Sequence, residues 1–285
     1  MEIVRKIKEM QDISDRIRSE NLTIACVPTM GYLHKGHLEL IKTAQKSSDV
    51  VVTTLFVNPL QFGANEDLDK YPRDFDRDFT LAENNGSEYL FYPEDTEMYT
   101  KGFQTSIVMK DVTGKFEGIS RPGHFDGVAT VVAKLFNAVK PNIAIFGQKD
   151  YQQTILVKQL VADLNFDIEI IVVPTIREQD GLAMSSRNVY LSKEEREIAP
   201  VLYQSLTETR DYIFEGNRNR KLINDKLNEL IELPKIFDID YAVSASAETL
   251  DEPDIFPYEE DVVLLVAAKL GKTRLIDNII VKNNA

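Results

Sequence analysis

The sequence predicts an α/β fold: a Rossmann-like parallel sheet with helices on both faces, followed by a smaller α+β domain. Short apolar segments rich in Val and Ile alternate with amphipathic segments of helical period through residues 1–175. Strands of a parallel sheet are apolar throughout because helices cover both faces. After Pro174 the order changes, with helical segments first and strand-like runs last. We therefore expect a first domain at 1–175 and a C-terminal lid domain at 176–285, which suits a chain of 285 residues.

In the first domain, apolar positions at Ile3, Ile7, Met10 and Ile17 predict an opening amphipathic helix. Continuous apolar runs predict strands at 22–29, 48–58, 88–92, 142–147 and 168–175. Amphipathic segments between them predict helices at 37–48, 76–86, 123–140 and 151–165. This regular alternation is typical of strands that run parallel in one sheet.

In the second domain, a polar stretch at 177–188 leads into predicted helices at 193–214 and 220–233. Strands are expected at 237–245, 262–270 and 273–281. The segment LGKT at 270–273 resembles the end of a phosphate-binding P-loop, but that loop needs a glycine where Val266 stands. We expect a hairpin turn there instead.

Composition narrows the class of protein. The net charge of -13 argues against nucleic acid as the main partner. The single cysteine, Cys26, allows no internal disulfide and fits a reducing compartment. The charged N-terminal segment lacks the apolar core of a secretion signal, and no apolar run is long enough to span a bilayer. We expect a cytoplasmic protein with neither a nucleic-acid nor a membrane partner.

Ligands of open α/β sheets bind at the carboxyl ends of the strands, where this sequence places its polar residues. Thr29, Met30 and Gly31 follow the first apolar strand and lead to His34 and His37. Asn58 and Gln61 follow the second such strand, and the segment 147–153 follows a later one. We therefore expect a ligand site at this edge of the sheet.

The two histidines of PTMGYLHKGHLEL, three positions apart at the start of a helix, lie on one helical face. A metal site would need further ligands, but His124 is distant in sequence and Cys26 lies inside a strand. A helix N-terminus offers free N–H groups and partial positive charge to a phosphate, and Gly31 and Gly36 allow close approach. The phosphate interpretation is therefore favoured over a metal site or plain surface histidines.

The stretch HKGH fits the H-x-G-H signature of nucleotidyltransferases that transfer an adenylyl group, a superfamily that includes class I aminoacyl-tRNA synthetases. Six blocks occur in order between residues 28 and 188: PTMGYLHKGH, FVNPLQF, YPRDFDRD, RPGHFDGVATVV, FGQKDYQQ and DGLAMSSRN. Together they resemble the pantothenate synthetase (pantoate–β-alanine ligase) family, and the last block resembles its version of the mobile K-M-S-K-S loop.

This resemblance implies a two-step reaction in one site. ATP and pantoate give pantoyl adenylate and pyrophosphate, and β-alanine then attacks to give pantothenate and AMP. Mg²⁺ would bridge the phosphates, held largely by ATP and water rather than by a protein cage. The family also implies a homodimer.

The resemblance assigns catalysis to His34, His37, Lys149 and Arg187. Gly147 and Asp150 would bind ribose, backbone near Ile176 and Met184 would contact adenine, and the Ser-Ser-Arg loop would clamp the leaving phosphates. The full ATP set is Met30, His34, Gly36, His37, Gly147, Lys149, Asp150, Ile176, Met184, Ser185, Ser186 and Arg187. For pantoate, Gln61 and Gln153 would bind oxygens beside Met30, Phe62 and Val132, with Asn58, Tyr71, Arg121 and His124 in the same pocket.

Each assignment has a structural alternative. The glutamines could be surface amides, and Lys149 and Arg187 solvated charges. Ser185 and Ser186 could cap a turn or the following helix, and Asp150 could cap the helix that begins at Tyr151. Arg121 could anchor the loop SRPG, and His124 could be a helix residue with satisfied hydrogen bonds.

The function has alternatives as well. A nucleotidyltransferase with another acceptor would need no amine, and a non-catalytic ATP-binding regulator would need no aligned cations. A tRNA ligase is disfavoured by the acidic charge and by the lack of an anticodon-binding extension.

Overall fold

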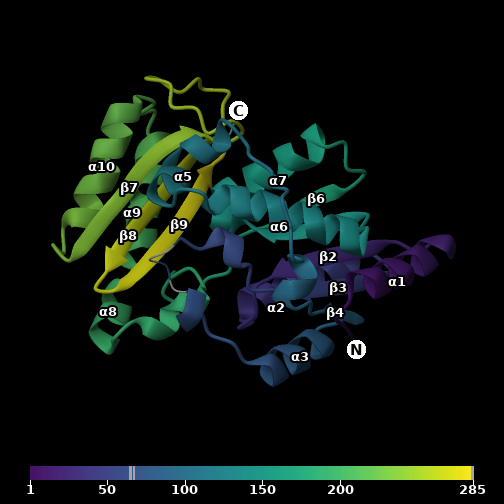
Figure 1. Cartoon of the computed structure of the whole chain (residues 1–285). Helices are drawn as coiled ribbons and strands as arrows, with labels where there is room; N and C mark the ends of the chain where they lie inside the picture. Colours follow the sequence, from purple (N-terminus) through teal and green to yellow (C-terminus); the bar gives the residue numbers. More distant parts are fainter. Residues whose placement is uncertain (64–65, 67, 284–285) are drawn as a thin grey trace.

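The computed structural model describes residues 1–63, 66 and 68–283, and two separate sheets dominate it (Figure 1). The larger sheet has six parallel strands in the order β1-β4-β3-β2-β5-β6. These strands are β1 (Glu2–Val4), β2 (Ile24–Thr29), β3 (Val50–Leu55), β4 (Tyr89–Phe91), β5 (Ile143–Gly147) and β6 (Glu169–Val173). From β2 the chain builds outward to β3 and β4 on one side and to β5 and β6 on the other. The predicted fold class is confirmed.

Helices cover both faces of this sheet (Figure 1). One face carries α1 (Ile7–Ser19), α6 (His124–Val139) and α7 (Tyr151–Asp163), and the other carries α2 (Lys35–Ser47) and α3 (Phe75–Asn84). Successive strand residues point to opposite faces, so Ile24 and Cys26 of β2 join the first core while Ala25 and Val27 join the second. Both faces are therefore apolar, as the continuous apolar strands predicted.

The C-terminal sheet is antiparallel, in the order β7-β8-β9. Its elements are α8 (Lys193–Ile198), α9 (Val201–Phe214), α10 (Arg220–Glu232), β7 (Phe237–Ser246), β8 (Val262–Leu270) and β9 (Thr273–Val281). Leu264 and Val266 of β8 pack in the core formed with α9 and α10. Val263 and Leu265 point the other way and pack with Tyr151 of the first sheet's domain. An apolar contact therefore joins the two parts.

Short elements complete the described chain. Two are helices, α4 (Asp95–Met98) and α5 (Phe116–Ser120). Five are single 3₁₀ turns: η1 (Pro59–Gln61), η2 (Leu68–Lys70), η3 (Val112–Gly114), η4 (Gln148–Asp150) and η5 (Ser186–Tyr190).

Two predicted elements were wrong in detail. Ile3 belongs not to the opening helix but to β1, where it pairs with Leu90 of β4. The predicted helix at 193–214 is two helices, because Pro200 has no backbone N–H to continue the first helix and instead precedes α9. The hairpin turn at LGKT is confirmed, with Leu270 paired to Thr273 and Gly271 at φ +58°.

Cys26 is fully buried in β2, and burial raises the pKa of its thiol, so it is a packing residue. None of the helices within residues 1–63, 66 and 68–283 is long and apolar enough to cross a membrane. The boundary at 175–176 stays a prediction. It lies between the end of β6 and the helices that cover the second sheet.

Candidate active site

A cavity opens at the carboxyl ends of β2, β3, β5 and β6, beside α6 and beneath the hairpin at 176–187. This is the point where the sheet order reverses between β2 and β5, the usual ligand position in such folds. The predicted residues that line it are Met30, His34, Gly36, His37, Gln61, Phe62, Tyr71, Arg121, His124, Val132, Gly147, Lys149, Asp150, Gln153, Ile176, Met184, Ser185, Ser186 and Arg187. Only Asn58 among the predicted site residues lies behind this lining.

His34 and His37 form the N-terminal cap of α2. His34 Nδ1 accepts the backbone N–H of Gly36 at 3.2 Å, and His37 Nδ1 accepts the backbone N–H of His34 at 3.3 Å. The rings lie with centroids 4.1 Å apart. Because each Nδ1 accepts a backbone proton, each neutral ring carries its own proton on Nε2. The pair thus presents two N–H donors beyond those of the helix end.

Both imidazoles are neutral at physiological pH. Burial, and then the charge of Lys149, lowers the pKa of His34 to about 4. Burial, then His34 and Lys149, lowers the pKa of His37 well below its usual value. Gly36 makes this packing possible, because a Cβ there would lie 2.9 Å from Cε1 of the His34 ring.

The turn before the histidines is held by Asp78, a residue that sequence reasoning did not select. Its carboxylate, 1% exposed, accepts the backbone N–H groups of Tyr32 at 2.6 Å and Leu33 at 2.7 Å. Gly31 at φ +85° and Tyr32 at φ +50° both adopt left-handed conformations, which cost energy for tyrosine. Asp78 lies 41 residues after His37 in the sequence, and only its position in the block YPRDFDRD pointed to it.

Lys149 leaves β5 in a turn that the second sheet supports. Asn278 of β9 donates its side-chain amide to the carbonyls of Gln148 at 3.0 Å and Lys149 at 2.9 Å. Within the part of the chain that the structure describes, the Lys149 ammonium makes no ion pair. Its charge is therefore available to a ligand in the cavity.

The Ser-Ser-Arg loop contacts the histidine turn directly. The Ser186 hydroxyl donates to the Tyr32 carbonyl at 3.4 Å. Ser185 caps η5 by accepting the Arg187 backbone N–H at 3.2 Å. Ser185 therefore does have the capping role that was its structural alternative. The guanidinium of Arg187 lies 6.0 Å from the ring centre of Tyr71.

Two parts of the site predicted to bind the nucleoside have hydrogen-bonding groups without a partner among the described residues. Asp150 stands at the N-cap position of α7, but its side chain makes no capping bond, and the carboxylate is exposed beside the cavity. In the hairpin, Met184 N–H donates to Ile176 C=O at 3.0 Å. The reciprocal bond is not formed among the described residues, which leaves Ile176 N–H and Met184 C=O as a donor and an acceptor.

Gln61, which also lines the cavity, is held from behind by Asn58. Asn58, 1% exposed, donates to Gln61 Oε1 and to the carbonyl of Gly127, both at 3.1 Å. Gln61 Nε2 lies 3.1 Å from Met30 Sδ. Gly127 lets this loop approach α6, because a Cβ there would lie 2.3 Å from the Leu60 carbonyl oxygen. The Gln153 amide has no hydrogen-bond partner among the described residues, so it too is available to a ligand.

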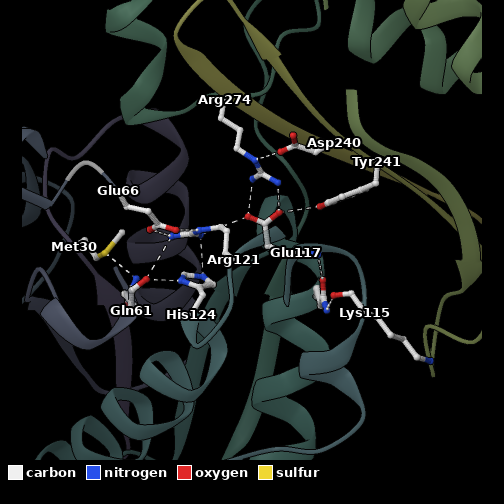
Figure 2. Close-up of polar contacts among 11 residues, drawn as sticks. Met30, Gln61, Glu66, Lys115, Glu117, Arg121, His124, Asp240, Tyr241 and Arg274 are labelled. Carbon is white, nitrogen blue, oxygen red and sulfur yellow. Dashed lines mark hydrogen bonds and ion pairs between the residues drawn. The ribbon is translucent and has the colours of Figure 1, made fainter. Parts of the chain in front are cut away.

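Arg121 and His124 are held in a network that reaches the second sheet (Figure 2). Arg121 makes a two-pronged ion pair with Glu66 at 2.7 and 2.8 Å. His124 Nδ1 donates to the Gln61 carbonyl at 2.7 Å, and its Nε2 accepts from Arg121 at 3.1 Å. Burial and Arg121 lower the pKa of His124 to about 4, so the ring is neutral. Both ring nitrogens of His124 make hydrogen bonds within the protein. This favours the alternative that His124 is a helix residue whose hydrogen bonds are already satisfied.

The cavity offers few protein ligands for a metal ion. No group of three or more His, Cys, Asp or Glu side chains within residues 1–63, 66 and 68–283 is arranged to hold an ion. Asp150 is the one carboxylate among the cavity-lining residues described above. This donor set fits an ion that arrives with a phosphate ligand better than one bound by protein alone.

The fold and this cavity define an α/β enzyme that binds a nucleotide. The family model for pantoate-beta-alanine ligase matches residues 2–280. Curated pantothenate synthetases are 50% identical in Caldicellulosiruptor bescii, over 99% of both chains, and 51% identical in Caldicellulosiruptor saccharolyticus, over 99% of this chain and 100% of that one. The chain therefore belongs to the pantoate–β-alanine ligase family.

Solved structures agree with this assignment. Pantothenate synthetase from Thermus thermophilus superposes with a TM-score of 0.92 at 43% identity, covering 99% of this chain and 100% of that chain. The pantoate-beta-alanine ligase from Francisella tularensis, solved with beta-gamma ATP and beta-alanine, gives 0.79 at 35% identity, covering 98% and 97%.

Proposed function

We propose that this enzyme condenses pantoate with β-alanine at the expense of ATP, through a pantoyl-adenylate intermediate, and releases AMP and pyrophosphate. One observation carries the proposal: a single cavity is lined both by phosphate-type donors and by amide and guanidinium groups that suit a small acid. The donors are His34, His37, Lys149 and the Ser-Ser-Arg loop. A cavity lined by both sets of groups suits a nucleotide and a small hydroxy acid held together.

In the first step, a carboxylate oxygen of pantoate attacks the α-phosphorus and the bond to the β-phosphate breaks. Pyrophosphate departs with the bonding electrons, and charge builds on the equatorial oxygens. The two Nε2–H donors would bind these oxygens without a change of protonation, because both rings are already neutral. The ammonium of Lys149 would offset the developing charge, and Ser185, Ser186 and Arg187 would hold the leaving phosphates.

In the second step, the amine of β-alanine attacks the acyl carbon and the bond to AMP breaks. The nitrogen loses its protons to solvent or to a neighbouring base as the amide forms. Mg²⁺, when bound, would neutralise phosphate charge and be held largely by ATP and water, since Asp150 is the one carboxylate among the described lining residues. The Francisella tularensis relative, solved with an ATP analogue and β-alanine, supports these two substrates.

The nucleoside would lie against the hairpin and the end of β5. Adenine presents an N–H donor next to a ring-nitrogen acceptor. Ile176 N–H and Met184 C=O form the complementary pair, while Asp150 and the backbone of Gly147 suit the ribose hydroxyls. Pantoate would be bound by Gln61 and Gln153, with Met30, Phe62 and Val132 around its methyl groups. Tyr71 and Arg121 would complete the pocket, and Asn58 and His124 would act through Gln61.

Pantoate-dependent exchange of labelled pyrophosphate into ATP, with Mg²⁺ present and β-alanine absent, tests this proposal. Exchange that requires pantoate would establish reversible formation of an acyl adenylate. ATP binding without exchange would indicate another acceptor or a binding protein. A homodimer in the cytoplasm belongs to the same proposal, supported by family membership, and sedimentation equilibrium would test the dimer.

A further inference from the structure

We propose that Arg274, a residue of the second sheet outside the lining of the cavity described above, is a positioning residue for the pantoate pocket. It would act by keeping Glu117 from capturing Arg121. This inference rests on the proposed function, because it assigns Arg121 to the pantoate pocket. Figure 2 shows Glu117 between Arg121 and Arg274, with a dashed contact to each.

Glu117 of α5 lies between two guanidinium groups and binds them unequally. Arg274 donates to both carboxylate oxygens of Glu117, at 2.7 and 2.9 Å. The Tyr241 hydroxyl adds a third hydrogen bond at 3.1 Å. Arg121 reaches Glu117 with a single N–H at 3.5 Å. The forked geometry makes the contact with Arg274 the stronger one.

Burial makes this competition consequential. The side chain of Glu117 is 9% exposed, and the ion pairs hold the pKa of its carboxyl below its usual value, so it stays charged. A buried carboxylate that loses one cation is destabilised in its charged form, so it attracts the remaining cation more strongly. If Arg274 were absent, the nearest cation would be Arg121, which already lies within 3.5 Å. Arg121 would then turn toward Glu117 and away from the cavity.

Arg274 is itself fixed from the other side. Its Nε donates to Asp240 of β7 at 2.5 Å, and its side chain is 22% exposed. The C-terminal sheet therefore holds the Arg274 guanidinium in place. Arg121 meanwhile keeps its two-pronged ion pair with Glu66 and its contacts with His124 and the Gln61 carbonyl at the cavity. The position of the Arg121 charge in the pantoate pocket thus depends on a residue more than 150 positions away in the sequence.

The test is a double-mutant cycle read by the KM of pantoate in pyrophosphate exchange. Arg274→Met should raise the KM of pantoate roughly tenfold and leave that of ATP within about twofold, since coupling between contacting charges is of this order. Glu117→Gln should leave the KM of pantoate at or below the wild-type value. The double variant should return to within about twofold of wild type, because the competing charge is gone.

The control is Lys269→Met, which removes the same charge from the same sheet. Lys269 lies 3.7 Å from Asp240 and is half exposed, without contact to Glu117. The proposal is overturned if the double variant is no better than Arg274→Met, or if Lys269→Met has the same effect. If Arg274→Met does not fold, the Glu117→Gln variant alone tests the proposal. A raised KM of pantoate in Glu117→Gln would overturn it, because Glu117 would then anchor Arg121 instead of competing for it. Wild-type enzyme without pantoate-dependent exchange would instead overturn the proposed function on which this inference rests.

Discussion

At the scale of single residues, the two histidines combine a structural and a chemical task. Each Nδ1 caps the helix α2, and this fixes the proton of the neutral ring on Nε2. A conventional cap such as serine would satisfy the helix but offer no second donor. The H-x-G-H pattern therefore follows from geometry, with glycine at the position that the His34 ring covers.

Replacing His34 by asparagine separates these two tasks. Asparagine can still accept the Gly36 N–H as an N-cap but has no donor at the position of Nε2. We expect turnover in pyrophosphate exchange to fall by roughly 10²–10³, the usual loss for one transition-state donor. His34→Ala should lose the same activity and also about 1 kcal/mol of stability for the missing cap.

Thermal unfolding and exchange kinetics on the two variants check this prediction. Ser192→Ala is the matched control, because Ser192 forms a capping box on α8 away from the cavity and should lose stability only. Wild-type turnover in His34→Asn would remove this donor from the mechanism.

At the scale of elements, the loop after β3 is placed by its contact with α6. Gly127 contacts the Leu60–Gln61 backbone, and Asn58 bonds to the Gly127 carbonyl. Because the carboxyl ends of parallel strands meet at one edge, the sequence alone could place Gln61 near the histidines. It could not assign Asn58 a role behind Gln61, or show that Gly127 supports the loop, because both depend on how closely the loop approaches the helix.

Gly127→Ala should therefore weaken the binding of pantoate selectively. Its Cβ would lie 2.3 Å from the Leu60 oxygen, so the loop must move. We expect a loss of about 1–3 kcal/mol in stability, typical of overpacking. We also expect a raised KM for pantoate with the KM of ATP unchanged. Gly114→Ala is the control, since a Cβ there meets no atom within 4 Å. A raised KM for ATP, with that of pantoate unchanged, would count against the assignment.

At the scale of the whole molecule, the order of apolar segments predicted the architecture of both sheets, and the motif blocks contain most of the residues that line the cavity. The contacts between the two parts were not predictable. Glu117 meets Arg274, and Asn278 meets the backbone of Lys149, only because of how the second sheet docks on the first. Periodicity reports which face of an element is apolar, but not the angle at which two domains meet.

The three histidines together predict how stability depends on pH. All are neutral in the folded state, with the pKa of His34 and of His124 lowered to about 4 and that of His37 lowered well below its usual value. In the unfolded chain their pKa is about 6.5. As the pH falls below this value, the unfolded chain binds protons that the folded chain does not, so stability decreases. Each histidine contributes a slope of at most about 1.4 kcal/mol per pH unit.

Urea unfolding between pH 7 and about 5, above most carboxyl titrations, should show this decline in stability. His124→Gln should reduce the slope by about one third, since one of three equivalent contributions is lost. An undiminished slope would mean that His124 is protonated in the folded enzyme.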